Sequence, residues 1–338
     1  MKRSIGLAVA LLVAAVVFSG LASAADKPLV GLITKTNTNP YFVTMKKGAQ
    51  KEAKKLGINL RTYAGRYDGD NQSQVRAIEN LISAGADGIL ITPNDPEAIV
   101  PTIRKARDAG IFVIALDTRL NPADAADATF ATNNFKAGVK IGKWARAMLG
   151  DKAKDAHIAM LDLHKNQPTV GVQRDQGFLK GFGIEINDPN FIGDENDDRI
   201  VGHDVTAGNP QGGRRAAENL LQRNHNTNVM YSINEPAAAG AYQALKSFGL
   251  TDQVLLVAID GSCAGVRNVK AGRLDATSMQ FPLRMAKKGM KAMAEYIKTG
   301  EKPVSGFVNT GTKLVTKTPV ETVDSISPEK GLKLCWGQ

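Results

Sequence analysis

Short apolar runs alternate with amphipathic stretches through the first third of the chain. Gly88–Thr92, for example, reads Gly-Ile-Leu-Ile-Thr and is apolar on both faces, which is typical of a strand buried in a parallel sheet. The stretches between such runs have the spacing of helices with one apolar face. The predicted strands are Leu29–Thr34, Asn59–Tyr63, Gly88–Thr92 and Ile111–Asp117, and the predicted helices are Phe42–Leu56, Gln72–Ser83 and Pro96–Ala109. This order predicts a parallel sheet with helices on both faces.

The same alternation then repeats over the second half of the chain. The predicted strands are His157–Leu163, Arg199–Val205, Val229–Ile233, Val254–Asp260 and Ala276–Met279, and the predicted helices are Lys136–Leu149, Val170–Phe182, Pro210–Arg223 and Pro236–Phe248. The fold class is therefore α/β, with two successive doubly wound lobes built on parallel sheets. No Gly/Ser-rich linker separates the two units, so we expect short strand-like crossings that permit hinge motion.

The N-terminus has the pattern of an export signal. Lys2 and Arg3 precede an apolar stretch, Ile5–Val17, and Ala22-Ser23-Ala24 fits a cleavage site for removal of residues 1–24. The alternative is a membrane anchor, but the apolar stretch is shorter than the roughly 20 residues that a spanning helix needs. We expect a mature protein that is not membrane-embedded and lies in the periplasm.

The composition is that of a globular protein, with 43% hydrophobic residues and a formal net charge of +10 in 338 residues. A basic protein raises the question of nucleic-acid binding. The lysines are scattered along helices, as at Lys46, Lys47, Lys51, Lys54 and Lys55, and are not interleaved with aromatic residues. We therefore expect a solvated basic surface and no nucleic-acid partner.

Only two cysteines are present, Cys263 and Cys335. An even pair in an exported protein favours a disulfide, which would hold the C-terminal segment against the loop after Asp260. Two buried free thiols are the alternative.

Polar side chains follow most of the predicted strands. In open parallel sheets, ligands bind at the carboxyl ends of the strands, where these side chains gather. The residues at or after these ends are Asn39, Tyr41, Phe42, Asp117, Arg174, Asn234, Asp260 and Gln280. Singly, each has an ordinary explanation as a helix cap, a turn residue or a surface ion pair.

Taken together, this set suits a neutral sugar. Carboxylates accept hydrogen bonds from hydroxyl groups, guanidinium groups donate, and carboxamides do both. The C–H face of a sugar ring packs on an aromatic ring, which Tyr41 and Phe42 supply. A phosphate site would instead need a glycine-rich turn at a helix N-terminus, and the sequence has none after a strand.

Six short motifs resemble those of the ribose-binding branch of periplasmic sugar-binding proteins that serve ABC transporters. They are Asn39-Pro40-Tyr41-Phe42, Leu116-Asp117, Arg174-Asp175-Gln176-Gly177-Phe178, Asn234-Glu235-Pro236, Asp260-Gly261 and Gln280-Phe281-Pro282. The resemblance covers the mature chain. Ile200-Val201-Gly202-His203-Asp204 and the terminal Cys335-Trp336-Gly337 are most similar to the fructose-import branch of this family.

The resemblance implies the type I periplasmic binding protein fold, with two lobes joined by a three-strand hinge. Residues 25–132 and 281–309 would form the N-terminal lobe, and residues 133–280 and 310–338 the C-terminal lobe. The helix Leu283–Thr299 would pack on the N-terminal lobe. The implied protein is a monomer without cofactor or metal that binds one monosaccharide and delivers it to ABC permease subunits.

The sugar-site residues implied by the resemblance are the eight residues at the strand ends, divided between the lobes and the hinge. Thr118 stands where the ribose pattern has arginine, and Gly208-Asn209 stands where that pattern has an aromatic residue. These departures favour a fructose-like ketohexose over ribose, with mannose as a further alternative. Lys35, Thr118, Asn209 and Glu235 are additional candidates, and whether Lys35 or Glu235 reaches the ligand is left open.

Three other functions compete with sugar transport. An α/β enzyme would need catalytic groups, but the four histidines lack metal-binding spacing, and Arg174 is expected to keep both Asp117 and Asp260 ionised. A sugar-responsive repressor would need an N-terminal helix-turn-helix where this chain has an export signal. A periplasmic sensor subunit for a chemoreceptor or kinase is not distinguished from a transport protein by sequence.

Overall fold

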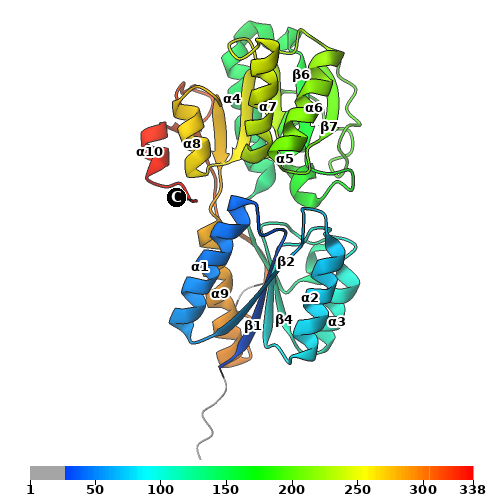
Figure 1. Cartoon of the computed structure of the whole chain (residues 1–338), viewed down its shortest axis with the longest axis vertical. Coiled ribbons are helices and arrows are strands. Elements are labelled where there is room, and N and C mark those ends of the chain that lie inside the picture. The colour runs from blue at the N-terminus through cyan, green and yellow to red at the C-terminus, as the bar shows by residue number, and fades with distance from the viewer. Residues whose placement is uncertain (1–26, 304, 338) are drawn as a thin grey trace, which may run out of the picture.

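The structure is a computed structural model that describes residues 27–303 and 305–337. The predicted signal peptide, residues 1–24, lies outside these residues. Two α/β lobes stand end to end, and each has helices on both faces of a central sheet (Figure 1). The predicted fold class is confirmed.

The first lobe contains a six-stranded parallel sheet with the order β11-β5-β4-β3-β1-β2. Its strands are β1 (Leu29–Thr34), β2 (Asn59–Ala64), β3 (Gly88–Ile91), β4 (Phe112–Leu116), β5 (Ala128–Ala131) and β11 (Gly306–Asn309). Helices α1 (Pro40–Leu56) and α9 (Pro282–Thr299) cover one face, and α2 (Asn71–Ser83) and α3 (Val100–Asp108) cover the other. A short 3₁₀ helix, Ala123–Ala125, precedes β5.

The second lobe contains a seven-stranded sheet with the order β13-β12-β10-β9-β8-β6-β7. Its strands are β6 (Ile158–Asp162), β7 (Ile200–Val205), β8 (Val229–Ser232), β9 (Leu255–Asp260), β10 (Ala276–Met279), β12 (Lys313–Thr316) and β13 (Ser325–Ile326), and β12 runs antiparallel to β10. Helices α4 (Asn134–Leu149) and α5 (Thr169–Phe182) cover one face, and α6 (Pro210–Arg223) and α7 (Glu235–Phe248) cover the other. Helices α8 (Cys263–Lys270) and α10 (Pro328–Leu332) lie at one edge, and a 3₁₀ helix, Gly150–Asp155, follows α4.

The chain passes between the lobes three times. It leaves the first sheet after β5 to form α4, returns after β10 to form α9, and leaves again after β11 to form β12. These three passages lie side by side and form the hinge. Because α9 packs against α1, a helix that follows the second lobe in sequence belongs to the core of the first.

Helices α4 and α5 approach each other closely through glycines. A Cβ atom on Gly142 would lie 2.2 Å from the carbonyl oxygen of Phe178, and one on Gly177 would lie 2.2 Å from that of Phe135. Any side chain there would push the helices apart, so glycine fixes the distance between them. This contact determines where α5 presents its side chains to the cleft.

Several predicted boundaries differ from the structure. The helix expected from Pro96 begins only at Val100, because Pro101 lacks an N–H group and is accommodated only in a first helical turn. Asp95 accepts hydrogen bonds from the backbone N–H groups of Glu97 and Ala98 and so caps the turn before it. Strand β5 was not predicted, because its alanines carry little strand signal, and neither was α8.

The C-terminal segment is attached to the hinge. Cys263 and Cys335 form a disulfide with Cα atoms 4.9 Å apart. The next residue, Trp336, donates from its indole nitrogen to the carbonyl oxygens of Gln280 at 3.0 Å and Asp260 at 3.2 Å. Its ring meets Tyr41 edge to face, with centroids 5.1 Å apart. The disulfide therefore holds an indole ring against groups that line the cleft.

Glu235, at the start of α7, is a buried carboxylate that accepts several hydrogen bonds. Its carboxylate accepts hydrogen bonds from the N–H of Gly261 at 2.8 Å, the hydroxyl of Thr277 at 2.8 Å, and both the N–H, at 3.0 Å, and hydroxyl of Ser262. Gly265 lies against it so closely that a Cβ atom would overlap the carboxylate. Burial raises the pKa of Glu235, although these hydrogen bonds lower it in part. Its partners follow β9 or lie on β10, so Glu235 fixes the end of β9 relative to α7.

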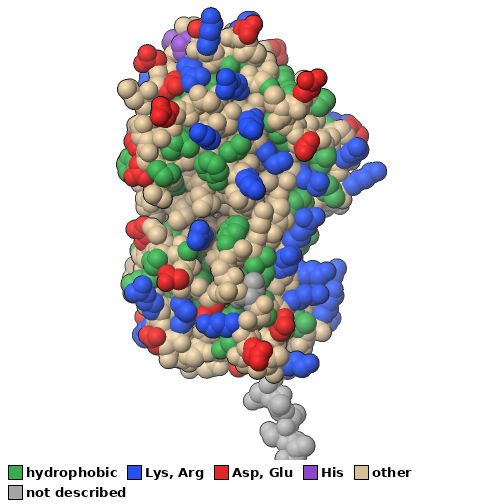
Figure 2. All heavy atoms as spheres, turned by 180° about the vertical axis from the view of Figure 1, so that it is seen from behind, with side chains coloured by type: hydrophobic (Ala, Val, Ile, Leu, Met, Phe, Trp, Pro, Cys, Tyr) green, Lys and Arg blue, Asp and Glu red, His purple; other side chains and the backbone are tan. Residues whose placement is uncertain are grey.

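Figure 2 shows the lysines and arginines spread over the surface, with a concentration along one edge of the first lobe. The α1 lysines Lys47, Lys51, Lys54 and Lys55 are exposed, whereas Lys46 is half-buried. Within the described residues, no helix has the length and apolar character to cross a bilayer.

Reduction of the disulfide is expected to lower the melting temperature. The bond closes a loop with a sequence separation of 72, which corresponds to about 4 kcal/mol in the chain-entropy model. Thermal unfolding with and without reductant measures the effect. The double variant Cys263→Ser/Cys335→Ser is the control and should melt at the same temperature in both conditions. An equal melting temperature for reduced and oxidised wild type would contradict the expectation.

Replacing Glu235 with alanine is expected to lower the free energy of unfolding by about 3 kcal/mol, because several buried donors lose their acceptor. Chemical denaturation measures this change. Glu79→Ala, at an exposed position on α2, is the matched control and should stay within about 0.5 kcal/mol of wild type. Equal stability of the two variants would show that the hydrogen bonds to the carboxylate of Glu235 do not stabilise the fold.

Candidate functional site

Side chains from both lobes enclose a small inner cavity of about 30 Å³. All eight residues predicted at the strand ends line it, together with Lys35. The lining consists of Lys35, Asn39, Tyr41, Phe42, Asp68, Asp117, Leu163, Val170, Arg174, Ile233, Asn234, Asp260 and Gln280. The carboxyl ends of both sheets therefore face the same space.

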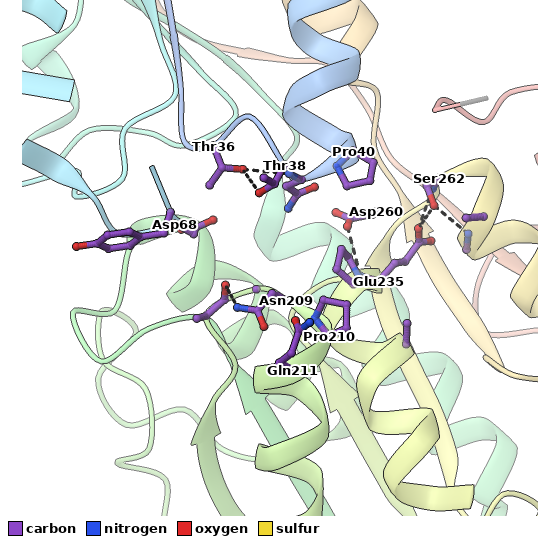
Figure 3. Close-up of a pocket in the computed structure, with 18 of the residues that line it drawn as sticks. Thr36, Thr38, Pro40, Asp68, Asn209, Pro210, Gln211, Glu235, Asp260 and Ser262 are labelled. Carbon is purple, nitrogen blue, oxygen red and sulfur yellow. Dashed lines mark hydrogen bonds between the residues drawn. The ribbon is translucent and has the colours of Figure 1, made fainter. Parts of the chain in front are cut away.

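A larger outer cavity of about 510 Å³ adjoins it. Asn39, Asp68 and Asp260 line both cavities. In Figure 3, Thr36, Thr38 and Pro40 of the first lobe face Asn209, Pro210 and Gln211 of the second across this space. The candidates Asn209 and Glu235 line only the outer cavity, and Thr118 lines neither.

In the first lobe, Tyr41 and Asp117 form a buried pair. The Tyr41 hydroxyl donates to Asp117 Oδ1 at 2.8 Å, and the Thr118 hydroxyl donates to Asp117 Oδ2 at 3.0 Å. Burial, and then the charge of Asp117, raises the pKa of Tyr41 well above its usual value, so the phenol stays protonated. Asp117 has a backbone φ of 64°, a left-handed conformation that costs a non-glycine residue about 1–3 kcal/mol. Thr118 thus acts through Asp117.

In the second lobe, Arg174 is held by two fixed acceptors. Its Nε donates to Asn134 Oδ1 at 2.8 Å, and its Nη1 donates to the carbonyl oxygen of Ile233 at 3.0 Å. Sequence analysis missed Asn134, the first residue of α4, because nothing local links it to a helix 40 residues later. The guanidinium is oriented before any ligand arrives.

Asp260 ends β9 and contacts Gln280, which lies where the chain returns to the first lobe. Its Oδ1 accepts from Gln280 Nε2 at 2.8 Å, and its Oδ2 accepts from the N–H of Glu235 at 3.3 Å. Burial raises its pKa to about 7, the charge of Glu235 adds to this, and Arg174 opposes it. Arg174 favours the ionised form of Asp260, as expected, but desolvation outweighs that attraction and leaves the pKa above its usual value.

Three candidate asparagines also cap helices. The Oδ1 atoms of Asn39, Asn209 and Asn234 accept from the backbone N–H groups of Tyr41, Gly212 and Ala237, each at 2.9 Å. The Nδ2 of Asn234 donates to the carbonyl oxygen of Gly208 at 3.1 Å. These side chains are therefore fixed by the helices they begin.

Lys35 and Asp68 add charge to the inner cavity. Lys35 is 1% exposed although it carries an ammonium group. Burial tends to raise the pKa of Asp68, but Lys35, His164 and Arg174 together lower it. Sequence analysis missed Asp68, although it follows a predicted strand and the same strand-end rule would have found it.

Charged and carboxamide groups from both lobes line one part of the inner cavity. Their side chains are those of Lys35, Asn39, Asp68 and Arg174. Opposite them, Phe42, Leu163, Val170 and Ile233 provide an apolar surface. The Tyr41 ring is instead packed edge to face between Phe42 and Trp336. Two cations face three carboxylates, which suits a neutral ligand with donors and acceptors on one side and C–H groups on the other.

Three comparisons with known proteins agree with this architecture. The D-allose-binding periplasmic protein of Escherichia coli is 30% identical over 277 residues, which cover 80% of this chain and 85% of that protein. The ribose import binding protein RbsB of Escherichia coli is 30% identical over 318 residues, covering 91% of this chain and 98% of that protein.

Among solved structures, a periplasmic solute-binding protein of an ABC transporter from Actinobacillus succinogenes, with bound D-allose, superposes with a TM-score of 0.74. It is 28% identical and covers 86% of this chain and 98% of its own. The family model described as periplasmic binding protein domain matches residues 30–302. The chain, with its two α/β lobes of the type I fold, therefore belongs to the periplasmic binding protein family.

Proposed function

We propose that this chain captures one neutral monosaccharide between its lobes and delivers it to the permease of an ABC transporter. The observation that carries the proposal is the inner cavity, where oriented polar groups from both lobes face an apolar wall. Binding in the micromolar range needs about −8 kcal/mol, or roughly 0.7 kcal/mol for each of about 12 heavy atoms. Buried charge-assisted hydrogen bonds supply free energies of this size.

The relatives support this ligand class. Their names specify D-allose and ribose, and the similar solved structure holds D-allose. Within the class we propose a fructose-like ketohexose. The support is local: Thr118 hydrogen-bonds to Asp117 where the ribose pattern has arginine, and Gly208 presents no aromatic ring to the cleft. Ribose, allose and mannose are the competing ligands.

We propose that binding works by opening and closing of the lobes. Across the cleft, His164 Nε2 lies 3.1 Å from Asp68 Oδ1, Asn166 Nδ2 donates to Asp95 at 3.2 Å, and the Thr169 hydroxyl donates to the carbonyl oxygen of Arg119 at 2.6 Å. The inner cavity of about 30 Å³ has room for roughly two water molecules. A sugar therefore enters only when these contacts separate, and its hydroxyl groups then favour reclosure.

The proposal also includes export of the chain and the division of its residues between the two lobes. Residues 1–24 direct the chain to the periplasm and are removed. The lobes comprise residues 25–132 with 281–309 and residues 133–280 with 310–338. The membership of β11 in the first sheet and of β12 in the second supports this division.

Calorimetric titration of purified protein with ketohexoses, aldohexoses, pentoses and polyols tests the proposal. We expect one sugar to bind with a stoichiometry of one. Asp117→Ala and Arg174→Ala should each weaken binding at least 100-fold while thermal unfolding stays cooperative. Arg76→Ala, on the exposed face of α2, is the control and should bind as wild type does. Failure of all sugars to bind, or unchanged affinity in both site variants, would sink the proposal.

Affinity is also expected to depend on pH through Asp260. Because its pKa in the folded protein is about 7, the ionised fraction rises from about a tenth at pH 6 to about nine tenths at pH 8. If a sugar hydroxyl donates to this carboxylate, affinity rises up to about tenfold over that range. The raised pKa also means that Asp260 contributes most stability to the unliganded fold below about pH 4 and loses it as the pH rises to 7.

Titrations at pH 6, 7 and 8 measure this dependence, and Asp260→Asn should remove it. A wild-type affinity that is constant across these pH values would show that the ligand does not use the ionised carboxylate.

A further inference from the structure

A buried cluster of ionisable side chains lies in the second lobe, outside both cavities. Asp162 ends β6, Asp175 lies on α5 and His203 lies on β7. Asp162 Oδ2 lies 2.9 Å from His203 Nδ1, and Asp175 Oδ2 lies 3.9 Å from the same nitrogen. One ligand atom from each of the three residues lies within 4.8 Å of the other two. Elements far apart in sequence thus direct two carboxylates and one imidazole to a single point.

The carboxylates of this cluster lack the partners that buried groups usually have. Asp175 is 0% exposed and Asp162 is 5% exposed. Both oxygens of Asp175 and Oδ1 of Asp162 have no hydrogen-bond donor among the described residues, and neither does the buried hydroxyl of Tyr231. A buried polar atom without a partner costs about 1–3 kcal/mol, and more when it is charged. Three such oxygens at one place indicate a missing positive partner.

No lysine or arginine in the described part of the chain forms an ion pair with these carboxylates. The positive group beside them is His203, whose Nε2 lies 2.6 Å from Glu195 Oε1. Even with a protonated imidazole, three carboxylates exceed the available positive charge by two.

We propose that Asp162, Asp175 and His203 bind one divalent transition-metal ion. An ion with bonds of about 2.1 Å requires ligand atoms about 3.0 Å apart in octahedral geometry and about 3.4 Å apart in tetrahedral geometry. The 2.9 Å between Asp162 Oδ2 and His203 Nδ1 matches the octahedral separation, and the 3.9 Å to Asp175 Oδ2 is about 0.5 Å longer than the tetrahedral one, so an ion would draw Asp175 inward. Nδ1 of a neutral imidazole binds the ion, and its proton remains on Nε2, where Glu195 accepts it.

The ligand types select the class of ion. One nitrogen and two carboxylates suit Zn²⁺, Mn²⁺, Fe²⁺ or Co²⁺, whereas Ca²⁺ prefers six to eight oxygen ligands. A carboxylate on the far nitrogen of a metal-bound histidine fixes the ring and strengthens the bond, which is the role of Glu195. Two negative ligands neutralise the ion.

The ion would connect three elements of the second lobe. It joins β6, β7 and α5, and through Glu195 it also holds the segment between α5 and β7. Arg174 precedes Asp175 on α5, so one helix contributes both to the inner cavity and to this cluster. The site is structural, since none of its residues lines either cavity.

Metal binding to chelator-treated full-length mature protein tests this proposal. We expect calorimetry with Zn²⁺ to give one ion per chain, Co²⁺ to produce d–d absorption bands, and the melting temperature to rise with Zn²⁺ concentration. Ca²⁺ should do none of these. Asp175→Asn and His203→Gln should lower Zn²⁺ affinity at least 100-fold, and Glu195→Gln should lower it about 10- to 100-fold.

Two exposed positions supply the controls. Asp155→Asn and His225→Gln should bind Zn²⁺ as wild type does, which separates the cluster from weak surface binding. Asp175→Asn keeps its shape and relieves charge crowding, so it is expected to fold, and its cooperative melting verifies this. Absence of stoichiometric Zn²⁺ binding, or equal affinity in Asp175→Asn and wild type, would overturn the proposal and leave a proton shared between Asp162 and Asp175 as the neutralising partner. Preferential binding of Ca²⁺ would overturn the assigned class of ion.

Discussion

A buried chain of hydrogen bonds through the hinge connects the two lobes, and the arrangement of the site depends on it. It runs from Asp117 through the Tyr41 hydroxyl, which lies 3.2 Å from Gln280 Oε1, and from Gln280 to Asp260. Asp117 and Tyr41 belong to the first lobe, and Asp260 ends a strand of the second. The indole nitrogen of Trp336 donates to the backbone carbonyl oxygens of Gln280 and Asp260 and so holds these two residues in place. Low dielectric strengthens these bonds, and loss of any one leaves a buried group unpaired.

This series of hydrogen bonds explains why the polar groups of the cleft are oriented without a ligand. Asp117 and Asp260 each have both carboxylate oxygens in hydrogen bonds within the protein. A ligand therefore meets fixed acceptors rather than mobile side chains, and it loses little side-chain entropy on binding. The free-energy cost of orienting these groups is already present in the unliganded fold, as the left-handed backbone of Asp117 and the raised pKa of Asp260 indicate.

Much of this arrangement was predictable from the sequence, because strand-end chemistry is a local signal. Asn39, Arg174 and Gln280 were found by their positions after strands, and the structure places them around one cavity. Asp68 also follows a strand and lines the same cavity, but it was not predicted. The helix start at Val100 differed because one proline decides which turn is helical. The unpredicted elements, among them β5, α8, β11, β12, β13 and α10, are short and carry weak patterns.

Other features were not predictable because they depend on pairs that only tertiary structure brings together. Nothing in the sequence indicates that Asn134 supports Arg174, or that burial at Asp260 outweighs a neighbouring guanidinium. The histidine spacing showed no metal motif, yet His203 meets Asp162 and Asp175 across three separate elements.

The second lobe thus combines two kinds of polar cluster on one helix. Arg174 lines the inner cavity, where its Nε and Nη1 donate to fixed acceptors. Asp175, the next residue, faces a point where negative charge is in excess and both of its oxygens lack donors. Because the glycine contact with α4 fixes α5, neither side chain can relieve its own imbalance by moving the helix. Each cluster must therefore be completed by something other than the helix itself, a hydroxylated ligand on one side and a cation or proton on the other.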